Sequence, residues 1–332
     1  MSKTYPVSKS TKATANLDEK TFNKMYEDSI NNPESFWARQ ASLQVDWIKQ
    51  PTEIVSYDMS KGKVEWFNDG QLNASFNCVD RHLDKPDSVA IIWESDDPSL
   101  SKKISYQELH DEVCKFSNLL KNRGVKKGDR VCIYMPMIPE AAYAMLACAR
   151  IGAVHSVVFG GFSVESLKDR ILDSNCETVI TADEGIRGGK KIPLKQNVDE
   201  ATKSCPNVHS VIIVKRTKLE LTLNDNIDVD YLSEKEKFDP ICDCEPMSAE
   251  DPLFILYTSG STGKPKGVLH TTGGYLLGAA LTHKYIFNYS DGDIYWCTAD
   301  VGWVTGHSYI VYGPLCNCLL YTSPSPRDST VS

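Results

Sequence analysis

The sequence predicts an α/β fold built on a parallel, doubly wound sheet, and two patterns support that prediction. Between residues 105 and 214, short apolar runs alternate with segments in which apolar residues recur at helical spacing. Consecutive parallel strands need a helical crossover, so this alternation indicates parallel strands with helices on both faces. After an acidic and polar stretch from Lys218 to Glu250, the apolar run Leu253 to Tyr257 resumes the pattern. We interpret the polar stretch as a connecting segment or an excursion over the surface.

The first predicted helix starts at a capping box. Ser105 and Glu108 have the spacing at which a hydroxyl and a carboxylate satisfy free N–H groups at a helix start. Apolar residues then recur at helical spacing until Gly124, which indicates the end of the helix. These apolar residues are Leu109, Val113, Phe116 and Leu120.

The elements that follow alternate regularly. Pro139 opens a second predicted helix and Gly152 closes it, and Ser163 caps a third helix that runs through Leu172. Four short apolar runs around these helices predict buried strands. They span residues 130–135, 154–159, 178–181 and 211–214.

Composition and charge argue against several classes of protein. The chain has 332 residues, enough for one large or two modest domains, and a formal net charge of −8. Such a charge disfavours nucleic acid or an acidic membrane as a partner, so any nucleotide must be held by local groups rather than by a global positive field. The eleven cysteines include no Cys-x-x-Cys pair, which predicts reduced thiols and no metal site. Because no run resembles a signal peptide or a membrane span, we expect a cytoplasmic (cytosolic) protein, and the sequence predicts no particular oligomeric state.

A loop rich in glycine and hydroxyl groups follows the apolar run that ends at Tyr257. Residues 258–267 are Thr-Ser-Gly-Ser-Thr-Gly-Lys-Pro-Lys-Gly. Glycines let backbone N–H groups approach an anion, hydroxyls donate to phosphoryl oxygens and lysines supply positive charge, so this run predicts a phosphate-binding loop. The residues assigned to the loop are Thr258, Ser259, Gly260, Ser261, Thr262, Gly263, Lys264, Lys266 and Gly267.

The loop is not a Walker loop. Only two residues separate Gly260 from Gly263, and Pro265 stands where the magnesium-binding hydroxyl would be. An ordinary polar surface loop is the alternative, but it would predict scattered polar residues rather than this order directly after a strand.

This run resembles the signature of the adenylate-forming enzymes, and other segments are similar to AMP-forming acetyl-CoA synthetases in particular. Residues 269–275 are Leu-His-Thr-Thr-Gly-Gly-Tyr, and residues 296–307 are Trp-Cys-Thr-Ala-Asp-Val-Gly-Trp-Val-Thr-Gly-His. Near the beginning, Asn-Pro-Glu-Ser-Phe-Trp at 32–37 and Trp-Phe-Asn-Asp-Gly-Gln-Leu-Asn at 66–73 resemble the amino-terminal region of short-chain acyl-CoA synthetases. Asn77 and the run Asp80-Arg81-His82 agree with that resemblance, which extends from about Met25 to Leu315.

The resemblance implies a domain organisation and a reaction. In the family, a large amino-terminal domain of two α/β subdomains precedes a small mobile carboxyl-terminal domain. We therefore expect a loose polar lead-in over residues 1–24, the amino-terminal region of the acetyl-CoA synthetases over 25–85, and an incomplete AMP-binding domain over 86–317. The implied activity is that of an acetate–CoA ligase (AMP-forming), which uses ATP and Mg²⁺ to form acetyl-adenylate and then transfers the acetyl group to CoA.

The resemblance also assigns roles in catalysis and substrate binding. Thr258 and Lys264 would act with the loop on the β- and γ-phosphates of ATP, and Trp303 would be the aromatic gate of the acyl pocket. Val304 and Thr305 would form one wall of that pocket, and Thr305 is also assigned to cofactor binding. Taken alone, a tryptophan among apolar neighbours is more often a core residue. No general base is assigned, because a carboxylate nucleophile needs none.

A second anion site is suggested by residues 183–191, Asp-Glu-Gly-Ile-Arg-Gly-Gly-Lys-Lys, just after a predicted strand. In the synthetases this segment contacts CoA, which implies CoA-binding roles for Arg187, Gly188, Gly189 and Lys190. The family more typically has Arg at Lys190, and lysine keeps the charge but loses the planar fork. Taken alone, such a cluster is usually a solvated surface. Residues 159–162, Phe-Gly-Gly-Phe, either line the same channel or form a helix-entry turn.

Other readings stay open. A propionate-specific or other short-chain ligase has the same architecture, and a nucleotide-binding product without catalysis belongs to another class. His307 fits a structural histidine and a site residue equally well. The family continues past Leu315 with a second pocket Trp, a ribose-binding Asp, a hinge and a catalytic Lys, so we expect this chain alone to be inactive. Residues 318–332 match nothing in the family and are interpreted as foreign sequence, such as a read-through junction.

Overall fold

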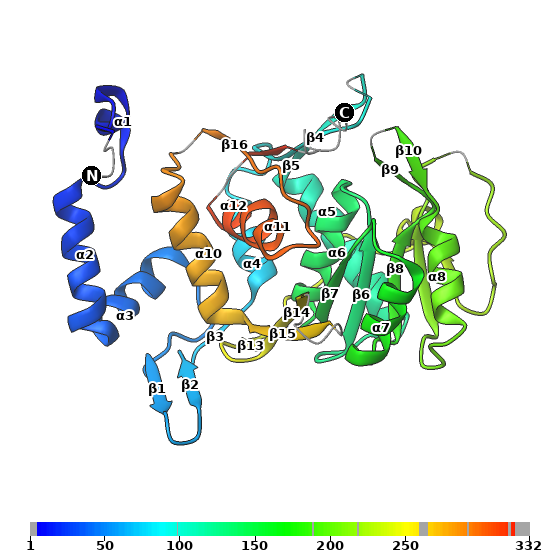
Figure 1. The fold of residues 1–332 in the computed structure, drawn as a ribbon, viewed down its shortest axis with the longest axis horizontal. Helices are drawn as coiled ribbons and strands as arrows, with labels where there is room; N and C mark the ends of the chain where they lie inside the picture. The colour runs from blue at the N-terminus through cyan, green and yellow to red at the C-terminus, as the bar shows by residue number, and fades with distance from the viewer. Residues whose placement is uncertain are drawn as a thin grey trace.

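A seven-stranded sheet lies at the centre of the computed structural model, which describes residues 5–97, 99–187, 189–217, 219–258, 265–290, 292–317 and 320–322 (Figure 1). The strand order is β12-β11-β8-β6-β7-β14-β15, and every neighbouring pair is parallel except β14 with β15. The strands are Arg130–Met135 (β6), Val154–Phe159 (β7), Thr178–Ala182 (β8), Ser210–Val214 (β11), Asp228–Asp230 (β12), Pro252–Thr258 (β14) and Lys266–Thr271 (β15). The predicted parallel α/β fold is confirmed, although the sequence pattern does not predict the antiparallel edge strand β15.

Alternate residues of the strands enter two cores, one on each face of the sheet. In β6, Val131 and Ile133 pack in the core beneath α5 and α6, whereas Cys132 and Tyr134 pack in the core beneath α7 and α8. The helices around this sheet are Tyr106–Asn122 (α5), Pro139–Arg150 (α6), Val164–Ser174 (α7), Leu194–Thr202 (α8) and Tyr231–Lys235 (α9). Helices on both faces make the sheet doubly wound, as the alternation of elements predicts.

The predicted helix starts are present. Ser105 Oγ accepts a hydrogen bond from the backbone N–H of Glu108 at 3.1 Å, and Glu108 Oε2 accepts one from the N–H of Ser105 at 2.8 Å. This reciprocal pair is a capping box. Pro139 occupies the first turn of α6, and Ser163 Oγ accepts from the N–H of Ser166 at the start of α7.

Replacing Ser105 with Ala is expected to lower the free energy of unfolding by about 1 kcal/mol, because one N–H group at the start of α5 loses its partner. Urea unfolding followed by circular dichroism measures the change. Ser101→Ala, at an exposed position of β5 (Ser101–Ser105), is the control and should change stability by less than about 0.5 kcal/mol. Equal losses in the two variants would contradict a capping role.

A smaller sheet and a second group of helices lie beside the main sheet (Figure 1). The order of the smaller sheet is β16-β17-β4-β5, from Val89–Glu94 (β4), Ser101–Ser105 (β5), Ile294–Trp296 (β16) and Leu320–Thr322 (β17). The accompanying helices are Thr272–Ile286 (α10), Val304–Gly306 (α11), the π-helical His307–Tyr312 (η2) and Gly313–Cys316 (α12). Strand β17 belongs to the segment interpreted as foreign, whose other residues lie outside the described ranges.

The amino-terminal region is more ordered than the sequence predicts. The expected lead-in over residues 1–24 contains helix α1 and the first part of α2, neither of which buries a residue. The elements of this region are Lys9–Thr14 (α1), Glu19–Asn31 (α2), Pro33–Gln44 (α3), Val55–Asp58 (β1), Lys63–Trp66 (β2), Gln71–Leu72 (β3), Ala74–Cys78 (α4) and Asp80–His82 (η1). Strand β3 pairs with Met247–Ser248 (β13).

The run Asp80-Arg81-His82 connects this region to the rest of the molecule through hydrogen bonds. Arg150 in α6 donates through both Nη atoms to the Asp80 carboxylate at 2.7 and 2.8 Å. Arg81 donates to the backbone carbonyl of Cys316 at 2.7 Å, and His82 Nε2 donates to the backbone carbonyl of Leu315 at 2.9 Å. These residues, which contribute to the family resemblance, therefore join three distant segments.

No helix in the described ranges is long and apolar enough to cross a membrane. The cysteines in those ranges are free thiols, most of them buried. Among the same residues, no three or more His, Cys, Asp and Glu side chains gather in a way that could hold a metal ion.

Candidate active site

The phosphate-type loop connects the antiparallel strands β14 and β15. Thr258 is the last residue of β14 and pairs with Lys266, the first residue of β15, while Tyr257 pairs with Gly267. A Cβ at Gly267 would lie 3.0 Å from Ile255 Cγ2, so glycine permits this close approach. The remaining residues assigned to the loop lie outside the described ranges: Ser259, Gly260, Ser261, Thr262, Gly263 and Lys264.

The base of the loop is anchored to helix α7. Tyr257 donates a hydrogen bond to Asp173 at 2.6 Å, and burial together with this carboxylate raises the pKa of Tyr257. The guanidinium of Arg170 lies 5.5 Å from the Tyr257 ring and 4.6 Å from the ring of Phe162. Strand β14 is also parallel to β7, so the loop leaves the sheet at the edge where ligands bind in open α/β folds.

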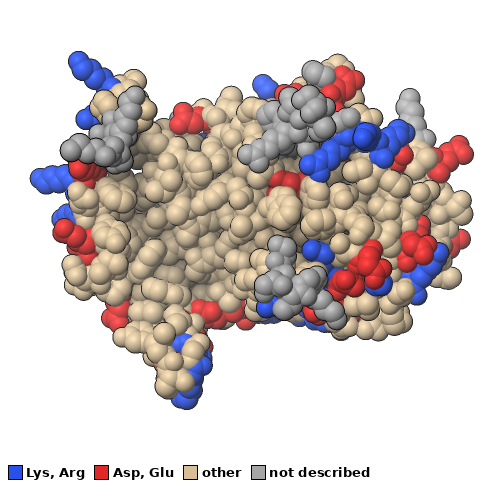
Figure 2. Space-filling view, viewed as in Figure 1, with Lys and Arg blue, Asp and Glu red and all other residues tan. Residues whose placement is uncertain are grey.

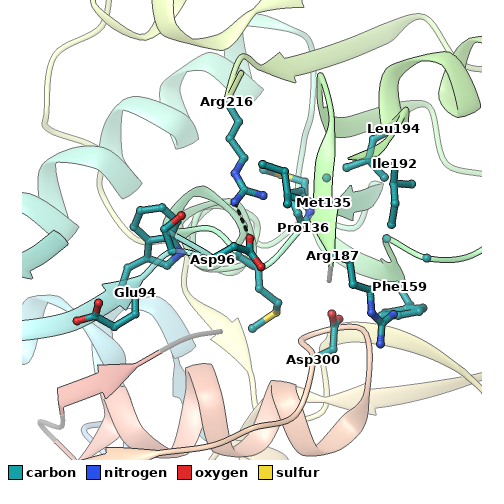
Figure 3. Close-up of a pocket in the computed structure, with 17 residues that line it drawn as sticks. Glu94, Asp96, Met135, Pro136, Phe159, Arg187, Ile192, Leu194, Arg216 and Asp300 are labelled. Carbon is teal, nitrogen blue, oxygen red and sulfur yellow. Dashed lines mark hydrogen bonds and ion pairs between the residues drawn. The ribbon is translucent and has the colours of Figure 1, made fainter. Parts of the chain in front are cut away.

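A cleft opens at the same edge (Figure 3). Met135 at the end of β6 and Phe159 at the end of β7 form its floor, and Trp93 of β4 lines another wall. Gly160 and Gly161 also line the cleft, and a Cβ at Gly161 would lie 2.5 Å from the Phe159 ring. The two glycines therefore border the cleft and also precede the capped start of α7. Residues 159–162 thus both line the cleft and form the turn that enters a helix.

The segment assigned to CoA forms a hairpin beside this cleft, from Gly185–Arg187 (β9) and Lys190–Ile192 (β10). Arg187 lines the cleft, with its guanidinium carbon 4.7 Å from the Phe159 ring centroid. Lys190 pairs with Arg187 across the hairpin and is exposed, but it is not part of the cleft lining. Gly189 has φ of +73°, which glycine adopts without strain, and Gly188 lies outside the described residues.

The residues assigned to the acyl pocket lie just outside the cleft. Trp303 precedes α11, and its ring centroid is 5.9 Å from that of Phe159. Gly302 makes this position possible, because a Cβ there would lie 2.9 Å from the backbone of Phe159. Trp303, Val304 and Thr305 are all exposed. The structure thus brings the proposed gate next to the cleft and leaves the proposed pocket wall accessible.

His307 has the environment of a structural histidine. It is fully buried, its Nδ1 donates to the carbonyl of Trp303 at 3.1 Å, and its ring lies 4.6 Å from Phe254. Burial lowers the pKa of His307 to about 4, so the ring is neutral at pH 7.

Four charged residues of the cleft lining are absent from the site residues assigned by sequence: Glu94, Asp96, Arg216 and Asp300. Arg216 and Asp96 both line the cleft and form an ion pair of 3.2 Å across it (Figure 3). One signal in the sequence points to Arg216, since it follows the predicted strand 211–214 just as Arg187 follows the strand 178–181. Charged residues directly after parallel strands reach the ligand-binding edge of the sheet. Asp96 has no comparable signal, because it lies in the connection between β4 and β5.

A doubly wound sheet with a glycine-rich loop and a cleft at its carboxyl edge is an arrangement that binds nucleotides and other phosphate-bearing ligands. The chain belongs to the AMP-binding enzyme family, whose model matches residues 80–330. Residues 22–78 match a second model, described as the acetyl-coenzyme A synthetase N-terminus. The two matches agree with the resemblance seen in the sequence.

Individual relatives agree with both family models. The chain is 61% identical over 314 residues to acetyl-coenzyme A synthetase 2 of Pseudomonas aeruginosa and 64% identical over 316 residues to acetyl-coenzyme A synthetase of Parvibaculum lavamentivorans. Each alignment covers 94% of this chain and 49% of the relative. The chain therefore spans about half the length of the curated relatives it matches.

Proposed function

We propose that this chain is the amino-terminal half of an acetate–CoA ligase (AMP-forming). One observation carries the proposal: the glycine-rich loop and the cleft open at one edge of the sheet, in a chain about 60% identical to acetyl-coenzyme A synthetases over nearly all its length. The reaction has two steps. The acetate carboxylate attacks the α-phosphorus of ATP and pyrophosphate leaves, and the CoA thiol then attacks the acetyl carbon and AMP leaves.

Charge is the main obstacle in the first step, because an anionic carboxylate must approach an anionic phosphate. The hydroxyls, backbone N–H groups and lysines of residues 258–267 are suited to hold the β- and γ-phosphates and to stabilise the departing pyrophosphate. ATP would be bound as its magnesium complex, which neutralises part of the triphosphate charge. In this proposal Thr258 and Lys264 act directly on the triphosphate, and Ser259, Ser261, Thr262 and Lys266 complete the set of donors.

The second step needs CoA beside the adenylate. The cleft next to the loop carries Arg187 on its wall and an aromatic floor at Phe159, features that suit phosphate groups and an adenine ring. Trp303, at the border of this cleft, would separate the acyl pocket from the CoA channel. Substrates of this kind and buried free thiols support the cytosol as the compartment.

Two alternatives remain as second candidates. A propionate or other short-chain ligase would use the same loop and cleft, and only the acyl pocket would differ. A nucleotide-binding product without catalysis would keep ATP binding and lose both chemical steps. Acetate-dependent exchange of pyrophosphate into ATP, measured with the full-length enzyme, tests the proposal, because only adenylate formation supports it. Exchange that depends on propionate instead of acetate would favour the first alternative, and no exchange with any short acid the second.

Replacing Val304 or Thr305 with a smaller residue is expected to broaden the acyl range. In the full-length enzyme, Thr305→Ala and Val304→Ala should each reduce the preference for acetate over propionate by about tenfold, because a lost wall makes room for one methylene. The ratio of kcat/KM values for the two acids is the measurement. Val268→Ala, at an exposed position of β15, is the control. An unchanged ratio in both pocket variants would place the acyl wall elsewhere.

A further inference from the structure

Two arginines from different strand ends enter the same cleft. Arg187 ends β9, and Arg216 follows β11 after one residue. Both line the cleft, and Figure 3 shows their side chains reaching it from opposite sides. Although the chain carries a net charge of −8, Lys and Arg side chains gather over β9 and β10, at the upper right of Figure 2. The lining of the cleft carries the three carboxylates Glu94, Asp96 and Asp300 beside the two arginines, so the basic charge that favours an anionic ligand lies at the β9–β10 side of the cleft.

A buried carboxylate fixes the backbone that carries Arg216. Asp183, 1% exposed, accepts hydrogen bonds from the N–H groups of Arg216 and Thr217 at 3.0 and 2.7 Å. It also accepts from the Thr217 hydroxyl at 2.8 Å. The neighbouring Glu184 Oε2 lies 3.1 Å from the same hydroxyl oxygen, whose single proton the two carboxylates share, and it accepts a hydrogen bond from Lys191 of β10 at 2.9 Å. One network therefore joins the Arg216 segment to the hairpin of Arg187, which holds the backbone segments that carry the two arginines in a set relation.

Asp96 neutralises the charge of Arg216 in this structure. Its Oδ2 accepts from Arg216 Nη2 at 3.2 Å, and the side chains of Arg216 and Asp96 are 14% and 31% exposed. Asp96 keeps 31% of its side-chain surface exposed, so a competing anion can reach the pair. A phosphate group offers more acceptor oxygens and more charge than one carboxylate, so it can take over the guanidinium.

We propose that Arg216 is a second phosphate-binding residue for CoA and that Asp96 is its exchangeable counter-ion. The inference rests on the proposed function and deepens it. CoA carries a 3′-phosphate and a pyrophosphate, more negative charge than Arg187 alone can pair. Two fixed guanidinium groups on separate walls of one cleft match a ligand whose phosphates lie at two places along its length.

The alternative is that the pair only links β4 to the main sheet. The two roles predict different changes in the affinity for CoA when Arg216 or Asp96 is replaced. If the pair is a structural link, removing either partner breaks it, and Arg216→Ala and Asp96→Asn both weaken CoA binding or both leave it unchanged. If Asp96 competes with CoA for Arg216, Arg216→Ala weakens binding and Asp96→Asn strengthens it.

The test is CoA binding to the chain by isothermal titration calorimetry, with 3′-dephospho-CoA, pantetheine and ATP as further ligands. Arg216→Ala should raise the Kd for CoA by about tenfold or more, as expected for a lost hydrogen bond between charged groups, and Arg216→Lys should recover part of it. Asp96→Asn should lower the Kd by about two- to fivefold, the range that corresponds to an exposed ion pair. The Kd for pantetheine, which has no phosphate, should not change in these variants. If the Kd for 3′-dephospho-CoA also does not change in Arg216→Ala, the 3′-phosphate is the group that Arg216 binds. Lys215→Ala, which removes a neighbouring positive charge paired with Asp230 at 2.7 Å, is the matched control.

Several results would overturn the inference: an unchanged Kd in Arg216→Ala, weaker binding in Asp96→Asn, an equal loss in Lys215→Ala, a matching loss of ATP affinity, or no CoA binding by the unaltered chain. Circular dichroism of each variant shows whether it is folded, and Arg216→Lys serves if Arg216→Ala is not. Pyrophosphate exchange by the full-length enzyme separates the two proposals. Exchange with no effect of Arg216 on CoA leaves the proposed function standing and removes only this inference, whereas absent exchange removes the function itself.

Discussion

Lowering the pH from 7 to 5 is expected to destabilise the folded protein severely, because four buried histidines are neutral in it. Burial lowers the pKa of His82, His283 and His307 to about 4 each, and it lowers the pKa of His155 well below its ordinary value. His155 and His307 stack on Phe254, and neither His155 Nδ1 nor His307 Nε2 has a hydrogen-bond partner among the described residues. A proton on either ring would be a buried charge without compensation.

The direction of the pH effect follows from the pKa of each histidine in the unfolded and in the folded state. In the unfolded chain these histidines take up protons below a pKa of about 6.5, whereas the folded protein excludes them until about pH 4. Their contribution to stability is therefore complete above about pH 6.5 and is lost as the pH falls toward 4. Each histidine costs about 1.4 kcal/mol per pH unit in that window, so four cost roughly 5 kcal/mol per unit, comparable to the whole stability of many domains.

Urea unfolding at a series of pH values between 7 and 5 measures this slope. His307→Gln should reduce this slope by about 1.4 kcal/mol per pH unit, which corresponds to one proton, since one buried imidazole is gone. His209→Gln, at an exposed position after α8, is the matched control and should leave the slope as it is. A free energy of unfolding that stays constant from pH 7 to 5 would show that these rings are protonated in the folded state.

Replacing Ser261 and Thr262 together with Ala is expected to reduce acetate-dependent pyrophosphate exchange of the full-length enzyme by about 10²–10³-fold. Donors aimed at charge that develops in a reaction contribute this much in other enzymes, and the departing pyrophosphate is where charge develops here. The KM for CoA should change far less, because the loop serves the first step. Steady-state exchange rates and the KM for CoA are the two measurements.

Ser233→Ala, at an exposed position of α9 far along the chain from the loop, is the control for this double variant. Its exchange rate should match that of the unaltered enzyme. A double loop variant with full exchange would mean that the hydroxyls of the loop only shape the connection between β14 and β15.

The central strands are predictable from sequence for a simple physical reason. Strands β6 and β7 have the predicted bounds because residues on both of their faces enter a core, which gives an unbroken apolar run. Strand β15 has no such pattern, since most of its residues are exposed at the edge of the sheet. Helix α1 has no apolar residues at helical spacing, and α2 has Phe22, Tyr26 and Ile30 at that spacing but leaves them exposed.

Some residues of the candidate site are also predictable from sequence, and others are not. Arg187 and Trp303 are found through motifs, and both lie at or beside the cleft. Asp96 is not found, because it reaches the cleft only through an ion pair with a residue 120 positions away. Contacts between such distant positions depend on how two sheets are placed, and local patterns in the sequence carry no record of that placement.

The hydrogen bond from Arg81 to the carbonyl of Cys316 can form only late in the synthesis of the chain. The two residues are 235 positions apart, and a ribosome that adds about 5–20 residues per second needs about 12–47 seconds to cover that distance. During this interval the nascent amino-terminal region has emerged without the segment that fastens it. The amino-terminal region therefore completes its contacts with the rest of the molecule only after most of the chain has been made.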